Sequence, residues 1–272
     1  MIERLHRAVL GAVNRVSRPG HPIRRAAGPL YSALLDAATL GRGLPATING
    51  AVFRIDPRFR WTAWHAHEAA VADFLRARVR PGQCCFDVGA NVGIYVLQLA
   101  RWSAPDGRVV AFEPNPATLR VLRRHVRLNH LDSRVTVVPM GAGAAAGDAL
   151  LYDTEAGSGL SRIGAVHPGT RVPVTPQTIA MTTVDEYCRT SGLVPDWMLI
   201  DVEGYEYEVL RGAADTLRRH RPHVVVELHQ HVSSDGSREA GLRLLDELGL
   251  DAIPIPGAAG RAEQFVSLQR RK

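Results

Sequence analysis

Residues 84–95 constrain the fold of this chain more than any other stretch. The apolar residues at the start of the stretch predict a buried strand that ends at Asp87. Gly89 and Gly93 then bracket a tight turn, and apolar residues with helical spacing follow it. A strand, a glycine-containing turn and a helix in this order are typical of the start of a nucleotide-binding α/β unit.

The residues within the turn favour one kind of ligand. Asn91 stands two residues after Gly89, where a dinucleotide fingerprint needs a second glycine so that backbone can approach a pyrophosphate. Asp87 places a carboxylate near the expected diphosphate and would repel it. S-adenosylmethionine, which joins an adenosine to a sulfonium and an α-amino acid, has the cationic end that this turn favours. A nicotinamide-dependent oxidoreductase and a plain strand-to-helix turn are the alternatives.

The rest of the chain alternates between predicted strands and helices. A hairpin is expected over 47–56 around Asn49-Gly50, after a helix over 26–40. Further strands are expected over 108–112, 134–139, 197–200, 224–228, 252–255 and 264–268, and helices over 61–79, 117–129, 205–220 and 237–248. Repeated βα units predict an α/β fold with a doubly wound, mostly parallel sheet and helices on both faces.

We expect a basic helical extension over residues 1–45 and an α/β domain over 46–272. Residues 1–30 hold six arginines and one acid, so they carry +5 of the net charge of +6. The remaining chain is nearly neutral, which does not favour nucleic-acid binding. Residues 1–18 would form an amphipathic basic helix that either lies on an anionic membrane surface or docks on the domain.

Several absences in the sequence favour a cytoplasmic protein, with peripheral contact at the inner membrane face through residues 1–18. The chain has neither an eighteen-residue apolar run nor the pattern of a signal peptide. Cys84, Cys85 and Cys188 do not have a metal-binding spacing, which fits a reducing compartment.

Residues 141–181 interrupt the alternation with a segment rich in Gly, Ala, Thr and Pro. Strand-like pieces are expected at 149–152 and 171–174. An insertion here would lie over the strand ends where ligands bind in open α/β sheets. We expect it to form a lid with its tip at 157–161; a surface excursion without function is the alternative.

Acidic residues follow the predicted strands at the edge where a ligand would bind. Glu113 lies twenty residues after Gly93, at a position where a carboxylate can accept hydrogen bonds from both ribose hydroxyls of an adenosine. Asp201 directly follows the apolar strand 197–200, whereas Glu203 and Glu206 fit the capping of a helix. Glu227 and His229 share one face of the next strand.

A methyl group on a sulfonium is transferred by in-line displacement, and an alcohol nucleophile must lose its proton. Asp201, Glu227 and His229 are the candidate catalytic residues, and the sequence does not rank them. Acids such as Asp201 and Glu227 could hold a divalent metal, but no oxygen-ligand spacing indicates one, so no metal is predicted.

Three segments together resemble the FkbM family of S-adenosylmethionine-dependent methyltransferases. They are residues 86–93, 111–116 and 200–206, and Asn129, Ala142, Asp185 and Glu227 also fit family positions. The resemblance implies the class I methyltransferase (Rossmann-like) fold, with seven strands of which the last is antiparallel. It also implies cofactor-binding residues: Asp87, Gly89, Asn91 and Gly93 at the methionine side, Glu113 at the ribose, and Met140 and Gly141 near the adenine.

The sequence and the resemblance together predict an O-methyltransferase. Known activities of the family suggest a hydroxyl of a sugar in a glycolipid or oligosaccharide as the acceptor. A polyketide or another secondary metabolite is an alternative acceptor, and a non-catalytic module that retains the fold is an alternative function. The oligomeric state is not predicted.

Overall fold

The computed structural model describes residues 22–59, 66–152, 162–164, 176–229, 237–259 and 263–270. The predictions for 1–18, 157–161 and 171–174 fall outside these residues. The chain divides into two compact units, one of residues 1–67 with 127–129 and one of 68–126 with 130–272. The predicted domain boundary between residues 45 and 46 stays a prediction.

The first unit contains a helix and a β-hairpin. Helix α2 spans Pro22–Ala38, strands β1 and β2 span Leu44–Ile48 and Ala51–Ile55, and a short 3-10 helix, η1, spans Pro57–Phe59. Asn49 and Gly50 both have positive φ, 44° and 84°, which is the backbone of the two-residue hairpin turn that their sequence predicts.

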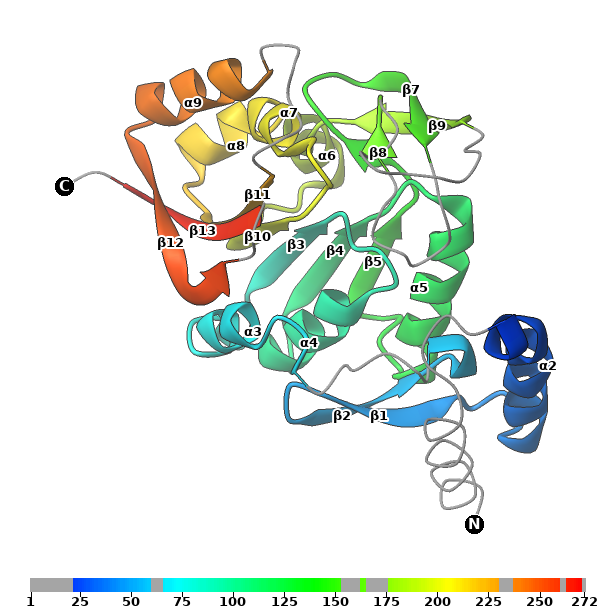
Figure 1. Ribbon diagram of the computed structural model, residues 1–272. Coiled ribbons are helices and arrows are strands. Elements are labelled where there is room, and N and C mark those ends of the chain that lie inside the picture. The colour runs from blue at the N-terminus through cyan, green and yellow to red at the C-terminus, as the bar shows by residue number, and fades with distance from the viewer. Residues whose placement is uncertain are drawn as a thin grey trace. The chain divides into compact units, whose positions relative to one another are not determined.

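The second unit is built around a seven-stranded sheet (Figure 1). Its strands are β3 (Cys84–Val88), β4 (Arg108–Phe112), β5 (Val135–Val138), β10 (Trp197–Ile200), β11 (His223–His229), β12 (Leu250–Ala259) and β13 (Glu263–Arg270). The order is β12-β13-β11-β10-β3-β4-β5, and only β13 runs antiparallel to its neighbours. This confirms the doubly wound, mostly parallel sheet with an antiparallel last strand.

Helices cover both faces of this sheet (Figure 1). On one face lie α3 (Ala69–Arg76), α4 (Ile94–Trp102) and α5 (Pro116–Leu128); on the other lie α6 (Val184–Ser191), α7 (Glu206–Arg211), α8 (Ala214–Arg219) and α9 (Ser237–Glu247). Among the described residues, none of the helices is long and apolar enough to cross a bilayer.

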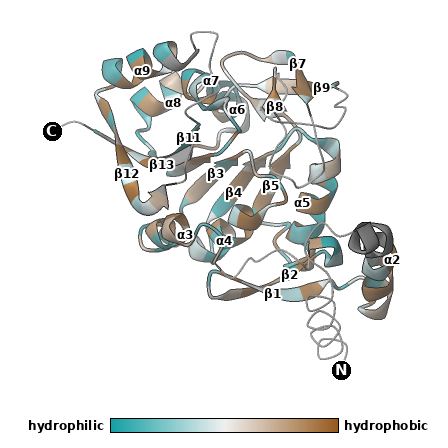
Figure 2. Cartoon of the chain, in the orientation of Figure 1, coloured by the Kyte–Doolittle hydropathy of each residue, from teal (hydrophilic) through white to brown (hydrophobic). Residues whose placement is uncertain are grey.

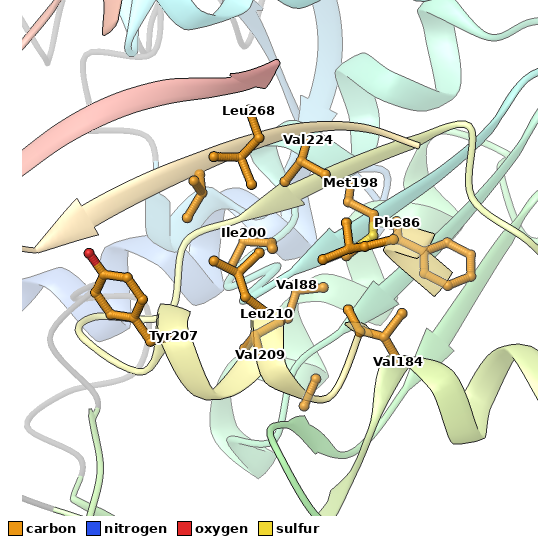
Figure 3. Packing of buried hydrophobic residues seen from close by; sticks show 14 of the residues in the cluster. Phe86, Val88, Val184, Met198, Ile200, Tyr207, Val209, Leu210, Val224 and Leu268 are labelled. Atoms are coloured by element: carbon orange, nitrogen blue, oxygen red, sulfur yellow. The ribbon is translucent and has the colours of Figure 1, made fainter. Parts of the chain in front are cut away.

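The core follows from the two-residue alternation of the strands. Phe86, Val110, Met198 and Val224 point to the face of α6–α9, where they pack against Leu210 and other buried residues (Figure 3). The intervening residues of each strand point to the opposite face. The residues of the strands are accordingly mostly hydrophobic and drawn in brown, whereas α9 alternates between hydrophilic and hydrophobic residues (Figure 2).

Three helix predictions need correction. Helix α3 begins only at Ala69, because Glu68 adopts the left-handed conformation with φ 43°. The single helix expected over 205–220 is two helices, α7 and α8, which separate where Gly212 packs against the backbone carbonyl of Gly143. Helix α6 was not predicted; Thr183 caps it by accepting a hydrogen bond from Glu186 N at 2.9 Å.

The insertion contributes a second, four-stranded sheet. Strands β6 (Gly141–Ala142), β7 (Gly147–Tyr152), β8 (Arg162–Ile163) and β9 (Pro176–Thr182) lie in the order β6-β9-β7-β8. Leu151, Ile179 and Met181 form its small hydrophobic cluster. The predicted strand at 149–152 is part of β7.

Replacing Gly212 tests the packing that separates α7 from α8. A Cβ at residue 212 would lie 1.9 Å from the carbonyl oxygen of Gly143, so Gly212→Ala must displace backbone. We expect urea unfolding to show a loss of about 3 kcal/mol. Gly192→Ala is the control. Gly192 has a φ of 72°, and a Cβ added there would have no other side chain or backbone within 4 Å, so we expect only backbone strain of about 1–2 kcal/mol. Equal losses in the two variants would contradict this packing.

Candidate active site

The glycine turn fits between the ends of β4 and β10. The backbone N–H groups of Gly89 and Ala90 both donate to the carbonyl of Phe112, at 3.1 and 2.9 Å. A Cβ at Gly89 would lie 1.8 Å from the carbonyl oxygen of Asp201, and the φ of Gly89 is 88°. Both the space and the backbone conformation therefore require glycine here.

Glu113 follows β4 and is held by backbone donors on both sides. Its Oε2 accepts from Asn91 N at 2.9 Å and its Oε1 from Asn115 N at 2.7 Å. The residue is buried, with 8% exposed. A carboxylate held in this way is a hydrogen-bond acceptor in a fixed position.

A pocket opens at the carboxyl ends of these strands. It is lined by Val88, Gly89, Asn91, Phe112, Glu113, Pro114, Thr118, Gly141, Ala142, Leu151, Ile163, Asp201, Val202 and Glu203. Residues from the insertion sheet line the pocket together with residues of the main sheet. Among the described residues that line it, three are acids and none is arginine or lysine.

Not every predicted cofactor residue lines this pocket. Gly89, Asn91, Glu113 and Gly141 do. Gly93 instead caps α4 and allows close packing against Leu122 of α5. Met140 packs against the core cluster beside Gly141. Asp87 is buried directly before the turn, with 2% exposed.

Asp87 carries an unsatisfied buried atom. Its Oδ2 is buried and has no hydrogen-bond partner among the described residues. Burial, and after it the nearby Glu113 and Glu68 carboxylates, raise the pKa of Asp87 to about 7. A positively charged ligand group close to Asp87 would stabilise its ionised form.

From its place on the predicted helix, Glu68 could either reach the cofactor or be a solvated surface acid, and the structure places it in this acidic group. The sequence suggests a solvated helix acid, but Glu68 is partly buried and its Oε2 accepts from the Tyr95 hydroxyl at 2.8 Å. Tyr95 is buried on α4. No sequence signal marks the left-handed turn at Glu68 that brings the two side chains together.

The second group of predicted residues also converges. Asp201, Glu227 and His229 each place a ligand atom within 4.8 Å of the others. The Oδ1 atom of Asp201 is buried and has no hydrogen-bond partner in the described part of the chain. Burial, and then the neighbouring Glu227 carboxylate, raise the pKa of Asp201 well above its usual range.

His229 is held by two further acids. Its Nδ1 lies 2.8 Å from Oε1 of Glu206 and its Nε2 lies 3.4 Å from Oε2 of Glu203. Burial lowers the pKa of His229, but the bonds to Glu203 and Glu206 outweigh burial and raise it to about 10. Glu206 also accepts from Gly204 N at 2.7 Å, so it both caps the turn before α7 and orients the imidazole.

Comparison with known proteins identifies the family. A sequence model of the methyltransferase FkbM domain matches residues 87–251, which is more than half of the chain. The chain belongs to the FkbM methyltransferase family. The predicted class I fold is confirmed, and the domain is a methyltransferase domain of a family that uses S-adenosylmethionine as the methyl donor.

Curated relatives cover different shares of this FkbM protein. Hexuronic acid methyltransferase AglP of Haloferax volcanii is 32% identical over 171 residues, which are 61% of this chain and 64% of AglP. Methyltransferase sdnD of Sordaria araneosa is 28% identical over 214 residues, 68% of this chain and 80% of sdnD. A ribosomal protein L11 methyltransferase of Chloroflexus aurantiacus is 32% identical over 108 residues, and this chain spans only 32% of its length.

Solved structures include the methyltransferase FkbM from Methylobacillus flagellatus KT. It is 17% identical, with a TM-score of 0.48, and the match covers 78% of this chain and 54% of that one.

The described residues fit the cofactor of the family. The pocket contains acids and no arginine or lysine among its described lining residues, which favours a cationic ligand over a diphosphate. Asp87 offers a buried carboxylate oxygen without a partner, and Glu113 offers a fixed carboxylate within the pocket. When bound, S-adenosylmethionine supplies an electrophilic methyl group on its sulfonium.

Asp87→Asn tests the electrostatics of the pocket. The folded-state pKa of about 7 lies above the unfolded value of about 3.9, so the stability lost through Asp87 grows as pH rises from about 4 to about 7 and is constant above that. The ligand-free variant should therefore melt at a higher temperature than wild type at pH 8, with a smaller difference at pH 5. Because the variant cannot ionise, calorimetry should show at least tenfold weaker binding of S-adenosylhomocysteine, which retains the ammonium group.

The exposed Asp73→Asn serves as the matched control, since Asp73 lies on the surface of α3 and forms an ion pair with Arg76. It should change neither the melting profile nor the affinity. A wild-type affinity in Asp87→Asn would contradict the role of this carboxylate.

Proposed function

We propose that this protein transfers a methyl group from S-adenosylmethionine to a hydroxyl of a sugar in a glycolipid or oligosaccharide. The similarity to AglP, which is named as a hexuronic acid methyltransferase, supports a sugar acceptor. A small acceptor also fits a pocket that the insertion sheet partly lines through Leu151 and Ile163.

The observation that carries this proposal is the convergence of Asp201, Glu227 and His229 next to the pocket. Asp201 lines the pocket and Glu203 lines it beside Asp201. A hydroxyl acceptor donates a hydrogen bond and must lose its proton during transfer, so it needs acceptor groups where it binds. An apolar acceptor would leave the buried Oδ1 of Asp201 without a donor, at a cost in binding free energy.

In this proposal, the residues of the glycine turn hold the cofactor. Asp87, Gly89, Asn91 and Gly93 form or support the methionine side. Two oxygens of Glu113 are fixed by backbone donors and accept the ribose hydroxyls, at about 1.5–3 kcal/mol for each hydrogen bond to a charged acceptor. Met140 and Gly141 lie at the adenine side, where the insertion sheet begins.

The acidic residues at β10 and β11 receive the acceptor. Asp201 and Glu227 orient the hydroxyl and remove its proton within the cluster, which is worth about 10²–10⁴ in rate. Glu206 and Glu203 fix the imidazole of His229 beside them. Alignment of the hydroxyl contributes several kcal/mol more.

Two features of the prediction extend this proposal beyond the described residues. In the first, residues 141–181 act as a lid over the pocket. The basis for this proposal is that Leu151 and Ile163, which belong to this segment, line the pocket. The contact of residues 1–18 with an anionic membrane, at the inner face of a cytoplasmic membrane, stays a sequence-based prediction.

Methyl transfer to defined acceptors tests the function. We expect labelled S-adenosylmethionine to methylate at least one member of a panel of hexose and hexuronic acid glycosides, with the label on an oxygen. Asp201→Asn should lower kcat at least 100-fold, because it removes a group that handles the hydroxyl proton, while the affinity for S-adenosylhomocysteine changes less than threefold. Asp73→Asn serves as the control variant.

Two outcomes would contradict the proposal. Methylation confined to polyketide hydroxyls would contradict the proposal that the acceptor is a sugar. Methylation of nitrogen alone would contradict O-methylation. Full activity in Asp201→Asn would show that Asp201 of the acidic cluster does not take part in the reaction.

A further inference from the structure

The cluster of Asp201, Glu227 and His229 has the composition of a metal centre. Two carboxylates and one imidazole place ligand atoms within 4.8 Å of one another. A cation with bonds of about 2.1 Å holds its donors at most about 4.2 Å apart, so a small inward shift completes the site. The residue spacing does not reveal this, because the ligands come from two different strand ends.

The histidine is oriented as metal-binding histidines are. Its Nδ1 lies 2.8 Å from Glu206, a residue with only 1% exposed, which fixes the ring and the tautomer. The same carboxylate is held by Gly204 N at 2.7 Å. The opposite nitrogen, Nε2, consequently faces the acids, at 3.9 Å from Oε2 of Glu227.

An independent observation points to a missing ligand at the same place. Oδ1 of Asp201 is fully buried and lacks a hydrogen-bond partner among the described residues. Burying such an atom costs free energy unless a donor or a cation satisfies it. Asp201, Glu203 and Glu227 bring several negative charges together, and the described lining of the adjoining pocket offers neither lysine nor arginine.

We propose that Asp201, Glu227 and His229 bind one divalent first-row cation that receives the acceptor hydroxyl. A mixed set of two carboxylates and one imidazole suits Mn²⁺ or Zn²⁺ better than Mg²⁺, which prefers oxygen ligands alone. Because Asp201 lines the pocket, the remaining coordination positions face the acceptor. The catalytic part of this inference rests on the proposed function; the cation site itself does not.

The cation completes the proton transfer as a balanced step. It stabilises the negative charge on the bound hydroxyl oxygen as the O–H bond breaks. With Asp201 and Glu227 engaged as ligands of the cation, the proton passes instead to Glu203, which lines the same pocket. The oxygen electron pair forms the new bond to the methyl carbon, and the electron pair of the breaking C–S bond leaves with the sulfur. Acceptors with two neighbouring hydroxyls can fill two coordination positions, which favours sugars.

Metal binding is measured first without any acceptor. The full chain is dialysed against EDTA and titrated with Mn²⁺, and free Mn²⁺ is followed by electron paramagnetic resonance. We expect one bound Mn²⁺ per chain, with affinity at least tenfold lower in Asp201→Asn and in His229→Gln. Glu247→Gln, an exposed acid on α9, should leave the affinity unchanged.

A second measurement uses the wild-type chain alone, so that the test of the cation site does not depend on whether the variants fold. Zn²⁺ should move the ¹⁵N resonance of His229 Nε2 to the position of a coordinated nitrogen. Failure of the wild type to bind Mn²⁺, or a Zn²⁺ titration that leaves the His229 resonance unchanged, would overturn the proposed site and leave a protonated imidazole between the acids. Full affinity in both folded variants would overturn it as well.

Turnover separates the cation from the proposed function. EDTA should lower methyl transfer to a hydroxyl acceptor at least tenfold, and Mn²⁺ should restore it. EDTA-resistant turnover would overturn the catalytic role of the cation while supporting O-methylation. If Mn²⁺ binds but no hydroxyl is methylated with or without it, the proposed function fails and the binding data still support the cation site.

Discussion

The concentration of buried carboxylates at one edge of the sheet is the constraint on which the site depends. Asp87 lies near the end of β3, and Glu113 and Asp201 follow the two neighbouring strands, β4 and β10. Asp87 and Glu113 are buried, and so is Oδ1 of Asp201. Their mutual repulsion is not relieved by a lysine or arginine among the described lining residues of the pocket. The chain therefore holds a negative field that only a cationic ligand, a metal ion or protons can neutralise.

The register of the parallel strands creates this field. Asp87 pairs with Leu199 on one side and Ala111 on the other, so the strand ends reach the same level. Ile200 pairs with Val226, which places the following residues, Asp201 and Glu227, side by side on one face. The other face of the same strands is filled by the apolar cluster under α6–α9 (Figure 3). The two-residue alternation of the strands therefore places the apolar core on one face of the sheet and the acidic residues of the site on the other.

Much of this arrangement could be predicted from sequence because it depends on local spacing. Glu113 comes twenty residues after Gly93, which fixes the strand end within one βαβ unit, and the apolar run before Asp201 fixes the end of β10. The division of the helix at Gly212 and the start of α3 at Ala69 could not be predicted, because both depend on backbone contacts or turns formed by distant folding. The contact between Glu206 and His229 likewise joins elements that only the tertiary structure brings together.

The proton balance of cofactor binding tests the central claim, that buried negative charge selects a cationic ligand. S-adenosylhomocysteine is titrated calorimetrically at pH 7 in buffers of different ionisation enthalpy, with NAD as the control ligand. Since the pKa of Asp87 is raised to about 7, we expect the protein to release about half a proton on binding, because the ligand ammonium stabilises the ionised carboxylate. Binding without proton release, or binding of NAD, would contradict it.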